Sequence, residues 1–255
     1  MLAVMTINRR GILITGANGR VGRVLTRAWR ETYELTLIDI QSSRRLYGTH
    51  VITADVHDTA AMRALCVNND TVVHLAISAN LGHTDESIYW ADICGALDVL
   101  NAALAANCRR VVFASSLAIE IHPKQLYSLT KLETEKYARQ LAESTGLSIH
   151  CLRLGRVLPP NDRAIWPTTK GCDRVLTHGD LVRLFTCSIE APTNVHFGVF
   201  NGTSRHAPSF YDISSSRIEL GYEPNDDVSE LARRNYSTPI GLLRRAKSRL
   251  RRAWT

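Results

Sequence analysis

The chain of 255 residues has no C-x-x-C pair and no Cys/His grouping at the spacing of metal ligands. Its six cysteines are scattered, so neither a disulfide framework nor a structural zinc site is expected, and reduced thiols are the default. Four of them lie in apolar periodic segments and are interpreted as small core residues: Cys66, Cys94, Cys108 and Cys151.

Long apolar runs are also missing. No segment approaches the roughly 18 uninterrupted apolar residues that span a bilayer. The apolar stretch at the N-terminus is too short for a secretory signal, and its charges follow it rather than precede it. These absences favour a cytoplasmic protein.

Acidic residues are absent from the last 24 residues, 232–255, which carry eight arginines and lysines. The whole chain has a net charge of +7, so the remainder is close to neutral. Apolar residues from Leu242 to Trp254 recur at helical spacing opposite these cations. The pattern indicates either a helix on an anionic membrane surface or partner, or a terminal helix packed on its own body. The tail lacks the motifs of a nucleic-acid reader, so no nucleic-acid partner is expected.

Residues 11–39 have the layout of a dinucleotide-binding βαβ unit. An apolar run at 11–15 leads into the turn Gly16-Ala-Asn-Gly-Arg-Val-Gly22, and an amphipathic stretch and a second apolar run follow. Gly16 lets the backbone turn off the strand, Gly19 lets it approach a pyrophosphate, and Gly22 lets the helix lie close to the sheet. The helix N-terminus then offers free N–H groups to phosphates.

The second apolar run ends in Asp39, 17 residues beyond Gly22. A carboxylate there can accept hydrogen bonds from the adenosine ribose hydroxyls and would repel a 2′-phosphate. NAD is therefore favoured over NADP, although Arg44 and Arg45 follow closely and weaken that preference.

Apolar strand patterns alternate with helical patterns over most of the chain. Strands are expected at 11–15, 35–39, 51–55, 71–76, 110–115 and 147–154, with a loop at 41–47 and helices at 59–66, 86–107 and 127–144. This alternation predicts an α/β fold with a doubly wound parallel sheet. We divide the chain into a dinucleotide-binding core at 1–154, a smaller irregular substrate-side segment at 155–230, and the basic tail at 231–255.

Tyr127 and Lys131 lie four residues apart at the start of the helix expected at 127–144, hence on one face. The preceding strand ends in Ser115-Ser116, at the sheet edge where ligands bind in such folds. A tyrosine with a pKa near 10 is a poor base at neutral pH. A nearby ammonium and a positive nicotinamide would lower that pKa, so that the phenolate could take a hydroxyl proton as hydride leaves the same carbon.

With these motifs the chain resembles the short-chain dehydrogenase/reductase superfamily over residues 10–230, and within it the extended branch of NAD-dependent epimerases and dehydratases. Uronate dehydrogenases, which oxidise C1 of a hexuronic acid with NAD, are the most similar members. Their pattern implies that Ser116 rather than Ser115 is the catalytic hydroxyl, that Lys131 also holds the nicotinamide ribose, and that Asp55 and Val56 lie beside the adenine. It further implies that two copies pair through the helices at 86–107 and 127–144.

Motif and resemblance together predict the catalytic residues Ser116, Tyr127 and Lys131. The predicted cofactor-binding residues are Gly16, Asn18, Gly19, Arg20, Val21, Gly22, Asp39, Asp55, Val56, Leu75, Ala76, Tyr127 and Lys131.

The sugar site departs from the family pattern. Tyr127 lies only 11 positions after Ser116, Leu117 stands where uronate dehydrogenases carry an asparagine, and Arg156 stands where they carry a small polar residue. Candidate substrate-binding residues are Ser78, Ser116, Arg156 and Arg163. Each arginine either clamps a carboxylate or phosphate or is a solvated loop residue.

Two histidines are interpreted as structural. His74 lies inside an apolar strand and is expected to be a hydrogen-bonded core residue. His178 is expected to open a helix, in a capping or packing role.

Three functions remain open. The first is an NAD-dependent dehydrogenase acting on a small sugar or sugar acid. The second is a nucleotide-sugar epimerase or dehydratase that returns the hydride to its substrate. The third is a non-catalytic NAD-binding scaffold. The short link between Ser116 and Tyr127 leaves little surface for a nucleotide diphosphate and favours the first.

Overall fold

The computed structural model describes residues 9–41, 45–78, 80, 82–158, 174–206, 209 and 211–230. Within these residues an eight-stranded sheet has the order β10-β7-β6-β5-β1-β2-β4-β3. Seven of its strands run parallel: β1 (Gly11–Thr15), β2 (Glu34–Asp39), β4 (Thr49–Thr53), β5 (Thr71–His74), β6 (Arg110–Ser116), β7 (Ser148–Leu154) and β10 (Phe197–Gly202). The predicted doubly wound sheet is confirmed.

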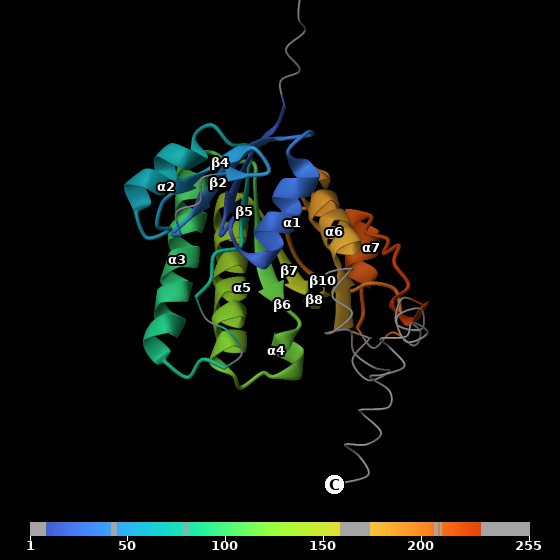
Figure 1. The fold of residues 1–255 in the computed structure, drawn as a ribbon. Helices are drawn as coiled ribbons and strands as arrows, with labels where there is room; N and C mark the ends of the chain where they lie inside the picture. The colour runs from blue at the N-terminus through green and yellow to red at the C-terminus, as the bar shows by residue number, and fades with distance from the viewer. Residues whose placement is uncertain are drawn as a thin grey trace, which may run out of the picture.

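Helices cover both faces of the sheet (Figure 1). One face carries α2 (Thr59–Cys66), α3 (Glu86–Ala105) and α5 (Leu126–Thr145), and the other carries α1 (Arg20–Trp29) and α6 (His178–Glu190). The strands alternate between two separate cores. On β1, for example, Ile12 and Ile14 pack with α1 and α6, whereas Leu13 packs with α2 and α3.

Helix α3 is long and apolar enough to cross a membrane by length and composition. It packs against α2, α5 and the strands β5 and β6, and these contacts bury Ile93, Val99 and Leu100, whereas Trp90 is exposed. Its Cys94 is exposed, so the prediction of a core position is wrong for this cysteine. Cys66, Cys108 and Cys151 are buried as predicted.

The segment expected to be a loop at 41–47 contains a short strand, β3 (Arg45–Leu46), which pairs antiparallel with β4. Tyr47 and Gly48 connect them with φ angles of 50° and 92°. Positive φ at both central residues is the geometry of a type I′ hairpin turn. Gly48 is typical of such a turn, but Tyr47 is an unusual residue at its first central position, so the turn was not predicted from the sequence.

Beyond Gly155 the chain forms β8 (Arg156–Leu158), β9 (Val175–Thr177), α6, β10 and α7 (Ser214–Leu220). β8 and β9 make a separate parallel pair, whereas β10 joins the main sheet beside β7 and α6 packs on α1. Part of the segment 155–230 thus extends the core, and the predicted domain division stays a prediction. Residues 159–173, which include Arg163, and the basic tail lie outside the described residues.

The N-terminus of α6 is capped by Thr177, whose Oγ1 accepts a hydrogen bond from the Asp180 amide at 3.2 Å. His178 is the first residue of α6, so the prediction that it opens a helix is confirmed. Because Thr177 is the cap, the packing role remains of the two roles predicted for the half-buried His178. The fully buried Asp180 carboxylate accepts hydrogen bonds from the amides of Asn225 and Asp226 and so holds that segment on α6.

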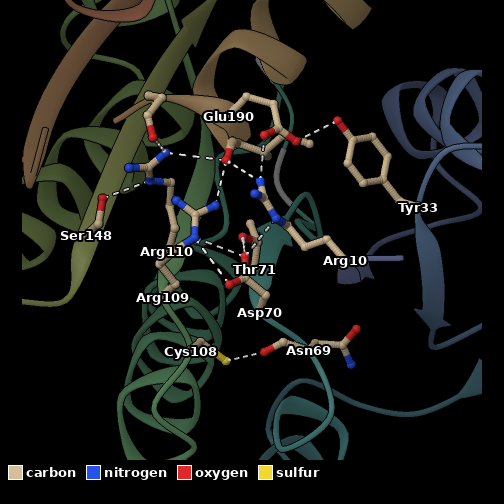
Figure 2. Close-up of polar contacts among 12 residues, drawn as sticks. Arg10, Tyr33, Asn69, Asp70, Thr71, Cys108, Arg109, Arg110, Ser148 and Glu190 are labelled. Atoms are coloured by element: carbon tan, nitrogen blue, oxygen red, sulfur yellow. Dashed lines mark hydrogen bonds and ion pairs between the residues drawn. The ribbon is translucent and has the colours of Figure 1, made fainter. Parts of the chain in front are cut away.

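Three arginines bind the C-terminal end of α6 at the amino edge of the sheet (Figure 2). Arg110 at the start of β6 is fully buried and donates to the carbonyls of Ser188 at 2.7 Å and Ala191 at 2.8 Å. Arg109 and Arg10 both donate to the Ile189 carbonyl and pair with Asp70 or Glu190. Cations at a helix C-terminus satisfy its free carbonyls and complement its dipole.

Replacing Arg110 by methionine is expected to destabilise the protein by at least about 2 kcal/mol, because several buried carbonyls lose their donors. Urea unfolding followed by circular dichroism measures the change. The exposed Arg27 of α1 provides a control, since Arg27→Met should change stability by less than about 0.5 kcal/mol. Equal losses in the two variants would contradict the structural role of the cluster.

Candidate active site

A cleft of about 1040 Å³ lies at the carboxyl edge of the parallel sheet, opposite the arginine cluster. It is lined from both halves of the sheet: by the glycine turn after β1 and the ends of β2 and β4, and by residues after β5, β6 and β7. Its volume is at the upper end for ligand sites, which is adequate for a dinucleotide and a small substrate. Ligands in open parallel sheets bind at this edge.

The glycine turn has the geometry that a dinucleotide site needs. Gly16 has a φ of +67°, and a Cβ there would meet the Ala76 backbone at 2.8 Å. A Cβ on Gly22 would meet the carbonyls of Gly16 and Ala17 at 2.6 Å. Gly22 therefore allows α1 to start tightly against the turn itself, rather than against the sheet as the motif suggested.

Asp39 lines the cleft at the end of β2. Its carboxylate accepts hydrogen bonds from the amides of Asn18 at 2.9 Å and Gln41 at 3.0 Å, so it is held beside the glycine turn. Asn18 Oδ1 is buried with no hydrogen-bond partner. An orphaned acceptor beside a glycine turn and a positioned carboxylate fit a dinucleotide.

The remaining predicted cofactor residues also line the cleft: Gly19, Arg20, Val21, Asp55, Val56, Leu75 and Ala76. Gly95 on α3 lies against Val56 and His57, where a Cβ would come within 2.9 Å of the Val56 side chain. This close approach places the segment after β4 directly on α3. Arg45, which could have favoured NADP, donates to the Gly48 carbonyl at 3.3 Å within its own hairpin.

His74 is the core histidine that the sequence indicated. It is 3 % exposed, and its Nδ1 shares a 2.8 Å hydrogen bond with Thr15 Oγ1. Burial lowers the pKa of His74 to about 3, and the nearby Lys131 ammonium acts in the same direction. The ring is therefore neutral at physiological pH and stacks on Phe113.

Ser116, Tyr127 and Lys131 converge in the cleft. The Ser116 hydroxyl lowers the pKa of the Tyr127 phenol and accepts a hydrogen bond from the Ala118 amide at 3.1 Å. Lys131 Nζ lies 6.0 Å from the centroid of the Tyr127 ring and 4.6 Å from that of Phe113. Helix α5 supplies the tyrosine and the lysine on one face, one turn apart, and the end of β6 supplies the serine.

Burial shifts the pKa values of both Tyr127 and Lys131 in the protein alone. Burial raises the pKa of Tyr127, and this effect outweighs the hydrogen bond from Ser116, which lowers it. The predicted lowering of the phenol pKa, by the ammonium together with the positive nicotinamide, concerns the cofactor-bound protein and stays a prediction. Burial also lowers the pKa of Lys131 to about 8, although the charge of Asp92 opposes the shift.

Ser115 faces away from this group. Its hydroxyl donates to Glu135 on α5, a carboxylate only 4 % exposed. Arg153 on β7 donates to both oxygens of the same carboxylate, at 3.0 and 2.7 Å. Sequence reasoning missed Glu135, although its position two turns beyond Tyr127 on one helix face was visible.

Ser78 and Arg156 line the cleft on its substrate side, and Arg163 lies outside the described residues. The Ser78 amide donates to Asp92 Oδ1 at 2.8 Å. Sequence reasoning missed Arg174, which also lines the cleft. No signal in the sequence pointed to Arg174, because no strand was expected at 175–177. Among the described residues, no cluster of three His, Cys, Asp or Glu side chains could hold a metal ion.

Comparison with known proteins gives consistent results. Residues 12–177 match the model of the NAD dependent epimerase/dehydratase family. A uronate dehydrogenase of Pseudomonas putida is 30% identical over 84% of this chain and 84% of its own. An NAD-dependent glucose-6-phosphate dehydrogenase of Haloferax volcanii is 26% identical over 86% of this chain and 94% of its own.

Among solved structures, a mutant uronate dehydrogenase from Agrobacterium tumefaciens complexed with NAD superimposes with a TM-score of 0.77. It is 25% identical, and the alignment covers 90% of each chain. Fold, cleft and sequence thus agree, and the chain belongs to the NAD dependent epimerase/dehydratase family.

Proposed function

We propose that this protein is an NAD-dependent dehydrogenase that oxidises a hydroxyl of a sugar or sugar acid, with Tyr127 as the base. The observation that carries the proposal is the convergence of Ser116, Tyr127 and Lys131 in the cleft that also contains the glycine turn and Asp39. The curated relatives named above, which act on uronates and on glucose 6-phosphate, support this substrate class.

The glycine turn and the start of α1 would hold the pyrophosphate, and Asp39 the adenosine ribose. Lys131 would hold the nicotinamide ribose. The bound cofactor supplies the hydride acceptor and, in its oxidised form, a positive charge beside the phenol.

The proposed proton transfer uses this chain's own groups. Ser116 orients the substrate oxygen, and the Tyr127 phenolate takes the hydroxyl proton onto Oη. Burial alone leaves the phenol with a raised pKa. The positive charge that accompanies the oxidised cofactor, together with the Ser116 hydrogen bond, would bring that pKa down.

Net oxidation is favoured over epimerisation because both relatives reported above are dehydrogenases. Accumulation of NADH during turnover distinguishes the two. The homodimer through α3 and α5, the contact of residues 239–254 with an anionic membrane and the cytoplasmic location stay predictions.

Tyr127→Phe is expected to lower the rate of NADH formation at least ~100-fold, since the variant loses its proton acceptor. NAD affinity, measured by calorimetry, should stay within about twofold because the ring is retained. Tyr137→Phe is a matched control on the same helix, where the phenol hydrogen-bonds Asn101, and it should leave the rate unchanged. Full activity of Tyr127→Phe would refute the proposed base.

Lys131→Met tests whether the cation is kept at a cost to stability. The pKa of Lys131 lies below its ordinary value of 10.5, at about 8. The contribution of Lys131 to the free energy of unfolding is therefore complete above pH 10.5. It decreases as the pH falls from 10.5 toward 8, because the unfolded chain takes up the proton at a higher pH than the folded protein does. As the pH falls from 10.5 to 8, the free energy of unfolding of the wild type should decrease relative to that of Lys131→Met, by up to about 1.4 kcal/mol per pH unit. Urea unfolding at pH 7.5 to 10.5 measures it, and a constant difference would contradict a buried amine.

A further inference from the structure

A hydrogen-bonded pair, His57 and Asp98, lies at the side of the cleft that β2 and β4 form. His57 follows β4 and lines the cleft, and its Nδ1 lies 3.2 Å from Oδ2 of Asp98 on α3. A carboxylate oxygen accepts hydrogen bonds and does not donate them, so Nδ1 carries the proton. In the neutral ring Nε2 is then an acceptor.

Helix α3 leaves room for this ring at Gly95, which also lines the cleft. A Cβ on Gly95 would lie 3.3 Å from Cε1 and 3.4 Å from Nε2 of His57. The ring therefore has its Nδ1 edge on Asp98 and its Nε2 edge beside Gly95. None of the hydrogen bonds between described residues uses Nε2. The side chain is 42% exposed, so a ligand in the cleft can reach this edge.

A second acceptor comes from the same short segment. Asp55 lines the cleft, and its Oδ1 accepts a hydrogen bond from the His57 amide at 3.0 Å. This bond closes an Asx turn that holds the two residues together. Oδ2 of Asp55 takes part in no hydrogen bond between described residues. The segment thus presents two acceptors to the cleft, a carboxylate oxygen and an imidazole nitrogen.

The order of the strands indicates which part of a dinucleotide meets these acceptors. The turn after β1 is assigned to the pyrophosphate and Asp39 after β2 to the adenosine ribose, and β4 is the next strand in the sheet. The base on that ribose therefore lies toward the end of β4, on the other side of β1 from Ser116 on β6. In NAD this base is adenine, whose exocyclic amine has two N–H donors.

We propose that His57, oriented by Asp98, binds the exocyclic amine of the cofactor's adenine together with Asp55. This rests on the proposed function, since it assigns the partners of one cofactor group in the same cleft. Asp55 is among the predicted cofactor residues, whereas His57 and Asp98 are additions to the site. The two N–H donors of the amine match the two acceptors. Asp98 is a positioning residue, because it keeps the proton on Nδ1 and so keeps Nε2 an acceptor.

Calorimetry with NAD and with its hypoxanthine analogue, in which an oxygen replaces the amine, tests the contact. It is carried out at about pH 8, where histidine is ordinarily neutral. The wild type should bind NAD at least about tenfold more tightly, because the analogue has no donor on that atom and leaves acceptors unpaired. His57→Phe keeps an aromatic ring without the nitrogen, and should reduce this preference at least about fivefold through weaker binding of NAD.

Three further variants sharpen the test. Asp98→Ala should also reduce the preference, whereas Asp98→Asn retains an oxygen for Nδ1 and should keep more of it. His50→Phe changes an exposed histidine of β4 outside the cleft and should leave the preference unchanged. Melting temperatures without cofactor monitor folding. Should His57→Phe fail to fold, Asp98→Ala must still reduce the preference for NAD.

The outcomes separate this proposal from the dehydrogenase assignment. Equal affinity of the wild type for both dinucleotides would overturn the adenine contact. So would an equal loss of both affinities in His57→Phe, since that marks a purely structural link between the segment after β4 and α3. NADH formation from a sugar alongside either result keeps the dehydrogenase. A preference for NAD that depends on His57, without NADH formation from any sugar, would overturn the dehydrogenase and keep the adenine contact.

Discussion

The geometry of the cleft depends on the hydrogen bonds and the ion pair that the buried carboxylate of Glu135 makes. A carboxylate 4 % exposed is tolerated only when its oxygens are well paired. Its partners come from two other elements, Ser115 on β6 and Arg153 on β7, and the arginine binds in the bidentate geometry that fixes orientation as well as distance. Helix α5 is thereby fixed over β6, which ends in Ser116, and over β7, which ends two residues before Arg156.

The two edges of the sheet divide structural and functional tasks. At the amino edge, Arg10, Arg109 and Arg110 donate hydrogen bonds to the C-terminal carbonyls of α6, so each of them is paired within the protein. At the carboxyl edge, Arg174 retains a donor without a partner. The same residue type is thus a structural group at one edge and is available to a ligand at the other. Burial and pairing, rather than charge alone, make the difference.

Sequence reasoning located most of the sheet because its signals are local. The runs 11–15 and 110–116 alternate with helices of clear period, and Gly16 and Gly22 are required by backbone contacts within a few residues of themselves or with the neighbouring strand. The direction of the Tyr127 pKa shift could not be obtained in this way, because it depends on burial that only the tertiary structure creates. Arg174 was missed for the same reason: the sequence does not show which of 31 basic side chains lacks a partner.

The short link between Ser116 and Tyr127 has a further consequence. It folds into α4 (Ala118–Ile121), whose first residue accepts a hydrogen bond from the Ser128 hydroxyl through its carbonyl and donates to Ser116 through its amide. The backbone of one buried residue, Ala118, therefore connects the strand that carries the hydroxyl to the helix that carries the phenol. The chain loses the conformational entropy of aligning these groups when it folds. A ligand therefore binds to groups that are already positioned, and more of its contact energy contributes to affinity.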